Sequence, residues 1–274
     1  MQYVEAHGAR IPQIGLGTMT LTGEAGVKAI KTALDLGYRH LDTAAHYGNE
    51  KENGEALRAS GVNRNDVFIT TKVRQDDAMP DAFARVVDQS LENLKLPYVD
   101  LLLIHWPSKT VPLNLTIGAL CKAKKDGKTK HVGVSNFTTT LLDEAWKLTS
   151  EPLVCNQIEV HPFINQNKVV DASKKRGMAV TAYVPIARGK VPGSEALERI
   201  GKAHGKTAAQ VSLRYLIELG LVPLPRSTSA AHLKENLEVF DFRLSPAEMA
   251  ELKALNANNM RVVNPPHAPV WDAA

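Results

Sequence analysis

The sequence predicts an α/β fold of the (β/α)8 barrel class. Short apolar runs rich in branched residues alternate with longer segments of helical periodicity from one end of the 274-residue chain to the other. Eight of these runs are strand-like, and the run at residues 101–104 is apolar on successive residues, as parallel strands covered on both faces are. No Pro-, Gly- or Ser-rich linker divides the chain, and such barrels have about 250 residues. We therefore expect residues 1–274 to form one closed barrel domain rather than a doubly wound sheet.

The predicted strands and helices alternate in a regular order. The strands are expected at residues 14–18, 40–43, 67–72, 100–105, 131–135, 154–158, 179–183 and 222–225. Apolar residues three and four apart predict helices between them, for example at 26–36, 81–94 and 207–219. Four glycines close helical segments shortly before a strand, where a left-handed cap favours glycine; they are Gly37, Gly127, Gly177 and Gly220.

The composition is that of a soluble globular protein. Hydrophobic residues make up 44% and charged residues 23% of the chain, which permits a large core and excludes disorder. The net charge of +4 is spread along the sequence, and the densest basic stretch, residues 122–130, is interrupted by Asp126 and Gly127. Such a stretch is typical of a solvated helix end, so we expect no nucleic-acid partner. Two cysteines, Cys121 and Cys155, make a disulfide framework improbable and favour a reducing compartment.

No targeting or membrane-spanning pattern is present in the sequence. The start lacks a positively charged stretch followed by an apolar one, which a secretory signal would need. The longest charge-free runs, residues 110–121 and 131–142, are far shorter than the roughly 20 apolar residues that span a bilayer. These observations predict a cytoplasmic protein with no membrane partner, and we expect it to be a monomer.

Two common nucleotide-binding motifs are incomplete. The run Gly15-Leu16-Gly17 lacks the third glycine of a dinucleotide-binding fingerprint. The run at residues 205–207 resembles the end of a P-loop, but Ile200 occupies the position of its first glycine. Any nucleotide must therefore be held in another way.

Four polar side chains fall at the C-terminal ends of consecutive predicted strands, where barrel active sites lie; they are Asp42, Tyr47, Lys72 and His105. A tyrosine hydroxyl is a poor acid at neutral pH unless a neighbouring cation such as Lys72 favours its phenolate. Asp42 would pair with Lys72, because a buried ammonium without a partner tends to lose its proton. His105 would donate a hydrogen bond to a substrate carbonyl and orient it for protonation by Tyr47. Each residue alone also fits a structural role, but their joint placement favours catalysis.

The local sequences resemble the aldo-keto reductase family. The matching motifs are residues 37–44 (GYRHLDTA), 47–50 (YGNE), 69–72 (ITTK), 101–107 (LLLIHWP), 133–137 (GVSNF) and 156–162 (NQIEVHP). They occur in the family's order, and the resemblance extends from Gly15 to about Trp271. Residues 259–264 and 268–272 are similar to the diketogluconate reductase branch of that family.

The resemblance implies an NADPH-dependent reduction of aldehydes and ketones. Tyr47 would be the general acid, with Lys72 and Asp42 tuning it and His105 orienting the carbonyl. The implied cofactor contacts are Thr18, Ser135, Asn136, Gln157, Tyr183, Arg226, Ser227, His232 and Asn236. The implied substrate pocket is formed by Met19, Arg74, Trp106 and Trp271, with the C-terminal segment 259–274 contributing to it.

Three positions depart from the family pattern. The clamp on the adenosine 2′-phosphate is usually Lys-Ser followed by an Arg, whereas this chain has Arg226, Ser227 and His232. Because an imidazole is mostly neutral at pH 7, we expect some use of NAD(H) beside NADP(H). Arg74 replaces a tryptophan of many relatives and favours a polar or anionic carbonyl substrate, such as a small dicarbonyl or a keto-sugar acid. Val184 replaces a serine that touches the pyrophosphate.

Three alternative functions stay open at this point. A Schiff-base aldolase on the same barrel would use Lys72 as nucleophile, although Asp42 beside it favours a charged ammonium over the lowered pKa that such an amine needs. A metal-dependent hydrolase would draw on His40, His46 and His105, but these do not form a compact metal motif, and we expect no metal. A nucleotide-sensing subunit without activity is disfavoured because all four proton-transfer residues are present.

Overall fold

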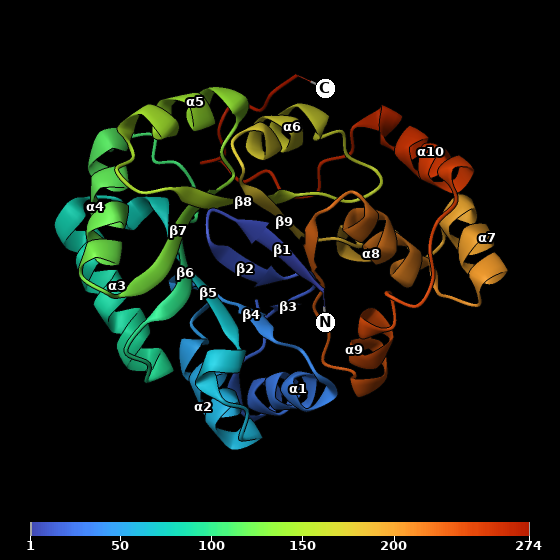
Figure 1. Cartoon of the computed structure of the whole chain (residues 1–274), viewed down its shortest axis with the longest axis horizontal. Coiled ribbons are helices and arrows are strands. Elements are labelled where there is room, and N and C mark those ends of the chain that lie inside the picture. Colours follow the sequence, from blue (N-terminus) through green and yellow to red (C-terminus); the bar gives the residue numbers. More distant parts are fainter. Residues whose placement is uncertain (1, 274) are drawn as a thin grey trace.

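The computed structural model describes residues 2–273 and confirms the (β/α)8 barrel (Figure 1). Eight strands form one sheet in which each strand pairs in parallel with the next strand of the chain. They are β3 (Leu16–Gly17), β4 (His40–Asp42), β5 (Phe68–Val73), β6 (Val99–Ile104), β7 (Thr129–Ser135), β8 (Leu153–Glu159), β9 (Ala179–Tyr183) and β10 (Val222–Leu224). The barrel closes because the backbone N–H groups of Gly15 and Gly17 donate to the carbonyl oxygens of Pro223 and Pro225, at 3.1 and 2.9 Å.

The two glycines of the incomplete nucleotide motif have a structural role at this closure. A Cβ atom on Gly15 would lie 2.7 Å from the side chain of Leu224 and 2.8 Å from that of His40. A Cβ atom on Gly17 would lie 3.1 Å from the carbonyl oxygen of Leu224. Only glycine therefore lets β3 approach β10 closely enough to complete the ring.

Helices surround the strands, as Figure 1 shows. The main helices are α1 (Gly23–Leu36), α2 (Glu50–Ser60), α3 (Pro80–Leu94), α4 (Leu113–Lys125), α5 (Thr139–Leu148), α6 (Asn167–Lys175), α7 (Glu195–His204), α8 (Ala208–Glu218), α9 (Ala230–Leu237) and α10 (Pro246–Ala254). Short 3-10 turns are η1 (Ala45–Tyr47), η2 (Arg64–Asp66), η3 (Gln75–Asp77), η4 (Ala187–Gly189) and η5 (Leu255–Asn258). Helices α7 and α10 are additions to the eightfold repeat and pair through His204 and Glu248, whose Nε2 and Oε1 atoms are 2.9 Å apart.

A hairpin that the sequence analysis did not predict covers one end of the barrel (Figure 1). Strands β1 (Tyr3–Ala6) and β2 (Ala9–Pro12) pair antiparallel around a turn in which His7 and Gly8 have φ values of 46° and 83°. Two consecutive residues with positive φ are typical of the tight hairpin turns whose twist matches that of the strands. The hairpin packs Ala6, Ala9 and Ile11 against the apolar interior of the barrel. The opposite end of the barrel stays open.

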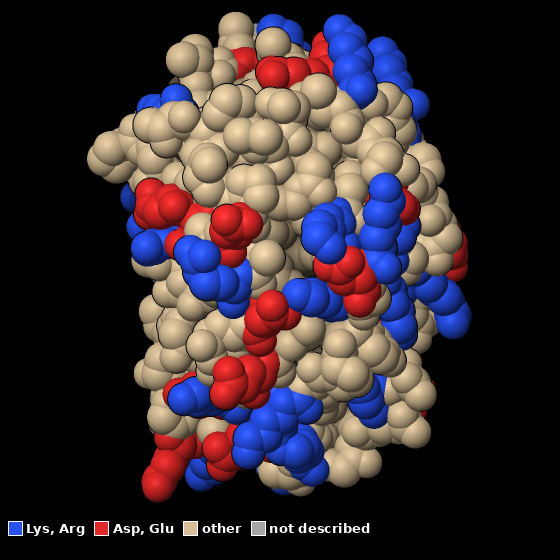
Figure 2. All heavy atoms as spheres, turned by 90° about the vertical axis from the view of Figure 1, so that its left-hand side faces the viewer, with Lys and Arg blue, Asp and Glu red and all other residues tan. Residues whose placement is uncertain are grey.

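The basic stretch at the end of α4 is paired with acidic side chains. Its ion pairs are Lys122–Asp126, Lys124–Glu151, Lys128–Asp88 and Lys130–Asp100. Figure 2, which views the molecule from the side on which Figure 1 places α3 and α4, shows basic and acidic side chains interspersed rather than one basic field. Within residues 2–273, no helix combines the length and apolar character needed to cross a bilayer.

Candidate active site

A cavity of about 1080 Å³ opens at the C-terminal ends of the strands. Asp42, Tyr47 and His105 line it, and Lys72 lies fully buried next to Asp42. Asp42 is the last residue of β4 and Lys72 the last but one of the adjacent strand β5, and Tyr47 follows β4 in the turn η1. The barrel thus brings together the four side chains that the sequence singled out.

Asp42 and Lys72 form the ion pair that was predicted. The Lys72 Nζ donates to Asp42 Oδ1 at 2.6 Å and to the carbonyl oxygen of Thr43 at 2.8 Å. Gln157 Nε2 donates to the other carboxylate oxygen of Asp42 at 2.7 Å. Burial lowers the pKa of Lys72, but the charge and hydrogen bond of Asp42, together with Tyr47, raise it, and the net shift is upwards. Lys72 is therefore a fixed cation.

Tyr47 lies beside this cation. The Lys72 ammonium is 5.2 Å from the centre of the Tyr47 ring. Burial raises the pKa of the Tyr47 hydroxyl, Lys72 lowers it, and the net shift is upwards. The sequence analysis anticipated the effect of Lys72 but not that burial would outweigh it. The hydroxyl consequently keeps its proton at neutral pH and can donate it.

His105 faces Tyr47 across the cavity floor. The two rings meet edge to face with centroids 5.7 Å apart. Burial, followed by the positive charge of Lys72, holds the pKa of His105 well below its usual value, so the imidazole is neutral. A neutral imidazole carries one N–H donor and one acceptor nitrogen. This state suits a hydrogen bond to a carbonyl oxygen.

Polar side chains on β7, β8 and β9 form the neighbouring wall. Asn136 has φ 63°, a left-handed conformation that asparagine tolerates, and its Nδ2 donates to the carbonyl oxygen of His105 at 2.9 Å. The Tyr183 hydroxyl donates to Asn136 Oδ1 at 2.6 Å. Ser135 is fully buried behind this wall and donates to the carbonyl oxygen of Gln157 at 2.8 Å. Asn136, Gln157 and Tyr183 border the cavity directly.

The side chains expected to hold a 2′-phosphate lie between the end of β10 and the first turn of α9. Arg226 lines the cavity, is exposed, and donates to Thr20 Oγ1 at 2.5 Å. His232 is exposed on the first turn of α9, where its backbone N–H donates to Ser229 Oγ. Ser227 caps the preceding turn by accepting from the N–H of Ser229 at 3.0 Å. These residues lie outside the closely packed part of the site.

Two further predicted cofactor contacts are buried and already make contacts within the protein. Thr18 borders the cavity, and its hydroxyl donates to the carbonyl oxygen of Asp42 at 3.0 Å. Asn236 lies near Tyr38, whose hydroxyl donates to the carbonyl oxygen of Leu233 at 3.1 Å. Thr18 thus ties the cavity wall to β4, whereas Asn236 lies within α9, the helix that also carries His232.

Three of the four residues predicted to form a substrate pocket, Met19, Arg74 and Trp106, line this cavity, and Trp271 does not. Residues 262–265 and His267 of the C-terminal segment line it as well. Trp271 instead packs behind Trp106, with ring centroids 6.0 Å apart. The guanidinium of Arg261 lies 3.8 Å from the centre of the Trp271 ring and covers it from the other side. Trp271 therefore supports the pocket wall rather than forming its surface.

Arg74 lines the cavity, but acidic neighbours offset its charge. Its Nε lies 3.4 and 3.2 Å from carboxylate oxygens of Asp76 and Asp77, and its Nη1 lies 3.2 Å from His46 Nδ1. Two carboxylates and one guanidinium leave this corner of the cavity without net positive charge. Arg74 therefore offers an anionic substrate less attraction than the sequence analysis expected.

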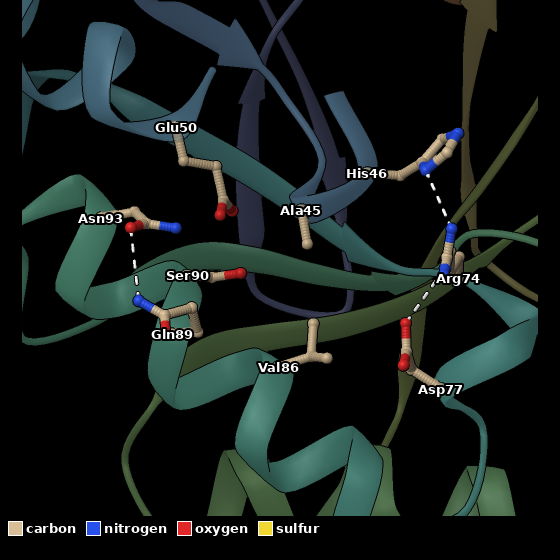
Figure 3. A pocket seen from close by; sticks show the side chains of 9 residues that line it. All are labelled: Ala45, His46, Glu50, Arg74, Asp77, Val86, Gln89, Ser90 and Asn93. Carbon is tan, nitrogen blue, oxygen red and sulfur yellow. Dashed lines mark hydrogen bonds and ion pairs between the residues drawn. The ribbon is translucent and has the colours of Figure 1, made fainter. Parts of the chain in front are cut away.

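A second cavity of about 340 Å³ shares Arg74 and His46 with the first. Figure 3 shows Glu50, Ser90 and Asn93 gathered at its other end. Glu50 is buried, accepts from the hydroxyl of Thr71 at 2.6 Å, and has a pKa raised by its burial. This carboxyl lies outside the barrel wall, because Thr71 and Lys72 are successive residues of β5 and point to opposite faces.

Glu159 is a buried side chain near the cavity that the sequence analysis did not identify. It ends β8 and is fully buried, yet it lies inside the motif NQIEVHP. Its place directly after the predicted strand 154–158 was the available signal, since a glutamate is seldom buried without a partner. In the loop after β9, the sequence analysis named Val184 but not Pro185 and Ile186, which line the cavity beside it. Within residues 2–273, no group of three His, Cys, Asp or Glu side chains could hold a metal ion.

Comparison with known proteins assigns the class. The family model Aldo/keto reductase family matches residues 13–257, and the chain belongs to this family of oxidoreductases. It is 40% identical to methylglyoxal reductase DkgB of Yersinia pestis over 96% of this chain and 99% of the relative. A crystal structure named as a 2,5-diketo-D-gluconic acid reductase B superposes with a TM-score of 0.97 at 46% identity, covering 100% of this chain and 98% of the other. The similarity predicted from the C-terminal segment is therefore confirmed.

A structure from Bombyx mori bears on the cofactor. This aldo-keto reductase in complex with NADP has a TM-score of 0.88 and 32% identity, covering 96% of this chain and 94% of the other. Members of the family generally use NADP(H) without a dinucleotide-binding fingerprint, which agrees with the incomplete glycine motif of this sequence.

Proposed function

We propose that this protein is an NADPH-dependent reductase of small dicarbonyl compounds, with Tyr47 as the general acid. The observation that carries the proposal is the protonated Tyr47 hydroxyl, held beside a buried Lys72–Asp42 pair and opposite a neutral His105. A proton donor, a fixed cation and a hydrogen-bond donor converge on one point of the cavity floor. Such an arrangement protonates a carbonyl oxygen.

The donor set of the cavity fits a nicotinamide cofactor. Gln157 uses one N–H on Asp42 and keeps its amide oxygen for a carboxamide, while the Tyr183 ring offers a flat wall. Arg226 lies at the far end of the cavity, where a phosphate would meet its guanidinium. When bound, the cofactor supplies a hydride to the carbonyl carbon.

The chain's own residues would perform the proton transfer. His105 donates its N–H to the substrate carbonyl and holds the oxygen near Tyr47. The Tyr47 hydroxyl gives its proton to that oxygen as negative charge builds there, and solvent later restores the proton. Lys72 stabilises the phenolate formed on Tyr47, and Asp42 keeps Lys72 charged and in place. The product is an alcohol with one added hydride and one added proton.

The electrostatics of the pocket favour a small neutral dicarbonyl over a keto-sugar acid. The charge of Arg74 is offset by Asp76 and Asp77, so the pocket offers an anion little attraction at this corner. Trp106 and residues 262–265 make another part of the cavity wall largely apolar. The names of the methylglyoxal and 2,5-diketo-D-gluconic acid reductases support both substrate classes, and pocket charge argues for the first.

The aldolase alternative conflicts with the state of Lys72. An amine nucleophile needs a depressed pKa, whereas Asp42 raises that of Lys72. Borohydride trapping in the presence of substrate should leave Lys72 unmodified, and a covalent adduct on Lys72 would instead support the aldolase.

The test is steady-state oxidation of NADPH and of NADH with methylglyoxal, 2,5-diketo-D-gluconate, an aromatic aldehyde and a keto ester. We expect the highest kcat/KM for methylglyoxal with NADPH, together with measurable activity with NADH because of His232. Activity confined to the sugar acid would contradict the substrate class. Absence of turnover with every carbonyl in the panel would contradict the proposed function.

A further inference from the structure

Glu159 joins the barrel to the C-terminal segment that lines the cavity. Its carboxylate accepts two backbone N–H groups, from Val262 to Oε1 at 2.6 Å and from Val263 to Oε2 at 2.9 Å. More than 100 residues separate the glutamate from these partners. Val262 and Val263 are among the residues that line the cavity. A fully buried charge at the end of β8 thus fixes part of the pocket wall.

A buried histidine completes the set of donors around this carboxylate. His161 Nε2 lies 3.0 Å from Glu159 Oε1, and His161 Nδ1 accepts from the N–H of Phe163 at 3.3 Å. Because Nδ1 is an acceptor, Nε2 carries the proton and donates to the carboxylate. Oε1 therefore receives two donors and Oε2 receives one.

This donor set suits a carboxylate and no neutral side chain. Three N–H groups point at two oxygen atoms, so both oxygens must accept. A glutamine has only one acceptor oxygen, and its NH₂ group would face an N–H. Burying a charge has a large desolvation cost, which is offset only when hydrogen bonds satisfy the charge fully. The carboxylate thus accepts all three donors, which a neutral side chain could not do.

The segment is held at its other end as well. Asp272 accepts from the N–H and the hydroxyl of Thr139, at 3.0 and 2.6 Å. Lys109 Nζ donates to the carbonyl oxygen of Pro266 at 2.9 Å between the two ends. The pocket-lining residues 262–267 have no regular secondary structure, so these ties set their position.

We propose that Glu159 is a positioning residue for substrate specificity, which acts through Val262 and Val263 and touches neither substrate nor cofactor. The proposal rests on the proposed carbonyl reductase function. It assigns to Glu159 the placement of the part of the cavity wall that Val262 and Val263 form. Loss of the carboxylate should therefore weaken substrate binding more than the proton-transfer step.

The first test is Glu159→Gln, followed by amide hydrogen exchange resolved to single residues. The glutamine oxygen should take the place of Oε1, where two donors meet, so its NH₂ group would face the N–H of Val263. Exchange at Val263 should accelerate at least about tenfold and more than at Val262, since the lost bond was made to a charged group. Equal exchange rates in wild type and variant would overturn the proposal. This readout needs no turnover, so it remains valid if the proposed function fails.

The second test measures kinetics with methylglyoxal at saturating NADPH. We expect Glu159→Gln to raise KM about tenfold while kcat and the Kd for NADPH change less than about twofold, because the wall contributes to binding rather than to chemistry. An equal loss in NADPH affinity would overturn the proposal and assign Glu159 to the cofactor side. A lowered melting temperature with unchanged KM would overturn it in favour of a purely structural role.

Glu218→Gln is the matched control. The Glu218 carboxylate also accepts a backbone N–H from a distant segment, that of Leu244 at 2.9 Å, together with Arg214 Nε at 2.6 Å. Glu218 is not among the residues that line the cavity. The variant Glu218→Gln should lower the melting temperature without changing KM for methylglyoxal. If Glu159→Gln does not fold, Asp272→Asn loosens the same segment at its other end and should raise KM in the same direction, and an unchanged KM there would overturn the proposal.

Discussion

The floor and the rim of the active-site cavity are stabilised in different ways. At the floor, Asp42 and Lys72 are buried and hydrogen-bonded to each other, with Gln157 on the second carboxylate oxygen. At the rim, the Arg226 guanidinium and the His232 imidazole are exposed to solvent. The three departures from the family pattern, at Arg74, Val184 and His232, are all outside the floor. In the proposed function, the barrel holds the proton-transfer groups, while the loops carry the residues proposed to set the choice of cofactor and substrate.

Dielectric surroundings explain this contrast. Charges at the floor interact through protein, so their mutual effects on pKa and stability are large. Charges at the rim interact through water and are screened by salt within about 10 Å at 0.1 M. Substitutions at the floor should therefore have large, salt-independent effects, and those at the rim small, salt-dependent ones.

The largest effect should follow Tyr47→Phe, which removes the acidic hydroxyl and keeps the ring. We expect kcat for methylglyoxal to fall about a thousandfold or more, as loss of a general acid does, with the Kd for NADPH nearly unchanged. The pH dependence of kcat in the wild type should show the titration of the same Tyr47 hydroxyl. Since burial raises the pKa of Tyr47, the reductive kcat should persist beyond the ordinary tyrosine value of about 10 before it falls.

Two results would contradict the assignment of Tyr47. One is near-normal turnover in the phenylalanine variant. The other is a wild-type profile that falls below pH 9, which would indicate that the cation and not burial dominates the hydroxyl. Fluorescence titration with NADPH serves as the control that the variant is folded and binds.

The next effect concerns stability at the floor. Lys72→Met leaves the buried Asp42 without its partner, which should lower the free energy of unfolding by about 3–5 kcal/mol. The double variant Lys72→Met with Asp42→Leu should recover part of that loss, because the uncompensated charge is gone. Lys31→Met is the control, since Lys31 pairs with Asp35 at 2.7 Å on the exposed surface and should leave the urea midpoint unchanged. Equal losses of unfolding free energy in Lys72→Met and Lys31→Met would contradict the contrast between floor and surface.

A third prediction uses a buried histidine at the closed end of the barrel. Burial lowers the pKa of His40 to about 4, so the unfolded chain binds a proton at this residue between about pH 6.5 and 4 and the folded chain does not. Stability should fall by about 3 kcal/mol as the pH drops through this window. Urea unfolding of wild type and His40→Asn at pH 7, 5.5 and 4.5 measures this pH dependence of the free energy of unfolding. The variant should lose less stability on acidification, and parallel pH dependences would refute the assignment.

The sequence predicted the floor better than the rim for a physical reason. Strand 179–183 has its predicted bounds, and the Asp42–Lys72 contact follows from two adjacent strand ends. Glu159 gave no comparable signal because its partners, Val262 and Val263, lie in a distant segment without periodicity. Trp271 was expected at the pocket surface but lies behind Trp106. Side-chain packing decides which of two aromatic residues lies at the pocket surface and which lies behind it. Packing between loops leaves no repeating pattern in the sequence.

The hairpin β1–β2 was missed for a different reason. Its two strands have four residues each and alternate weakly between exposed and buried positions. The turn at His7 and Gly8 was the available signal, since a residue followed by glycine between two short runs is typical of a hairpin.

The smallest expected effect is at the rim, where His232→Arg restores the family's usual residue. An arginine there would add a permanent charge near the position proposed for the 2′-phosphate, beside Arg226. We expect KM for NADPH to fall about threefold to tenfold in low salt, with KM for NADH unchanged, because NADH lacks that phosphate. The gain should shrink on raising the salt from 20 to 300 mM, whereas the effect of Lys72→Met should not. Arg226→Ala, which removes the remaining cation, should raise KM for NADPH relative to KM for NADH. Two results would contradict this prediction: an equal fall in KM for NADH and for NADPH, or an effect on KM that persists in high salt. Either result would mean that the added charge acts from a desolvated position, as the charges at the floor do.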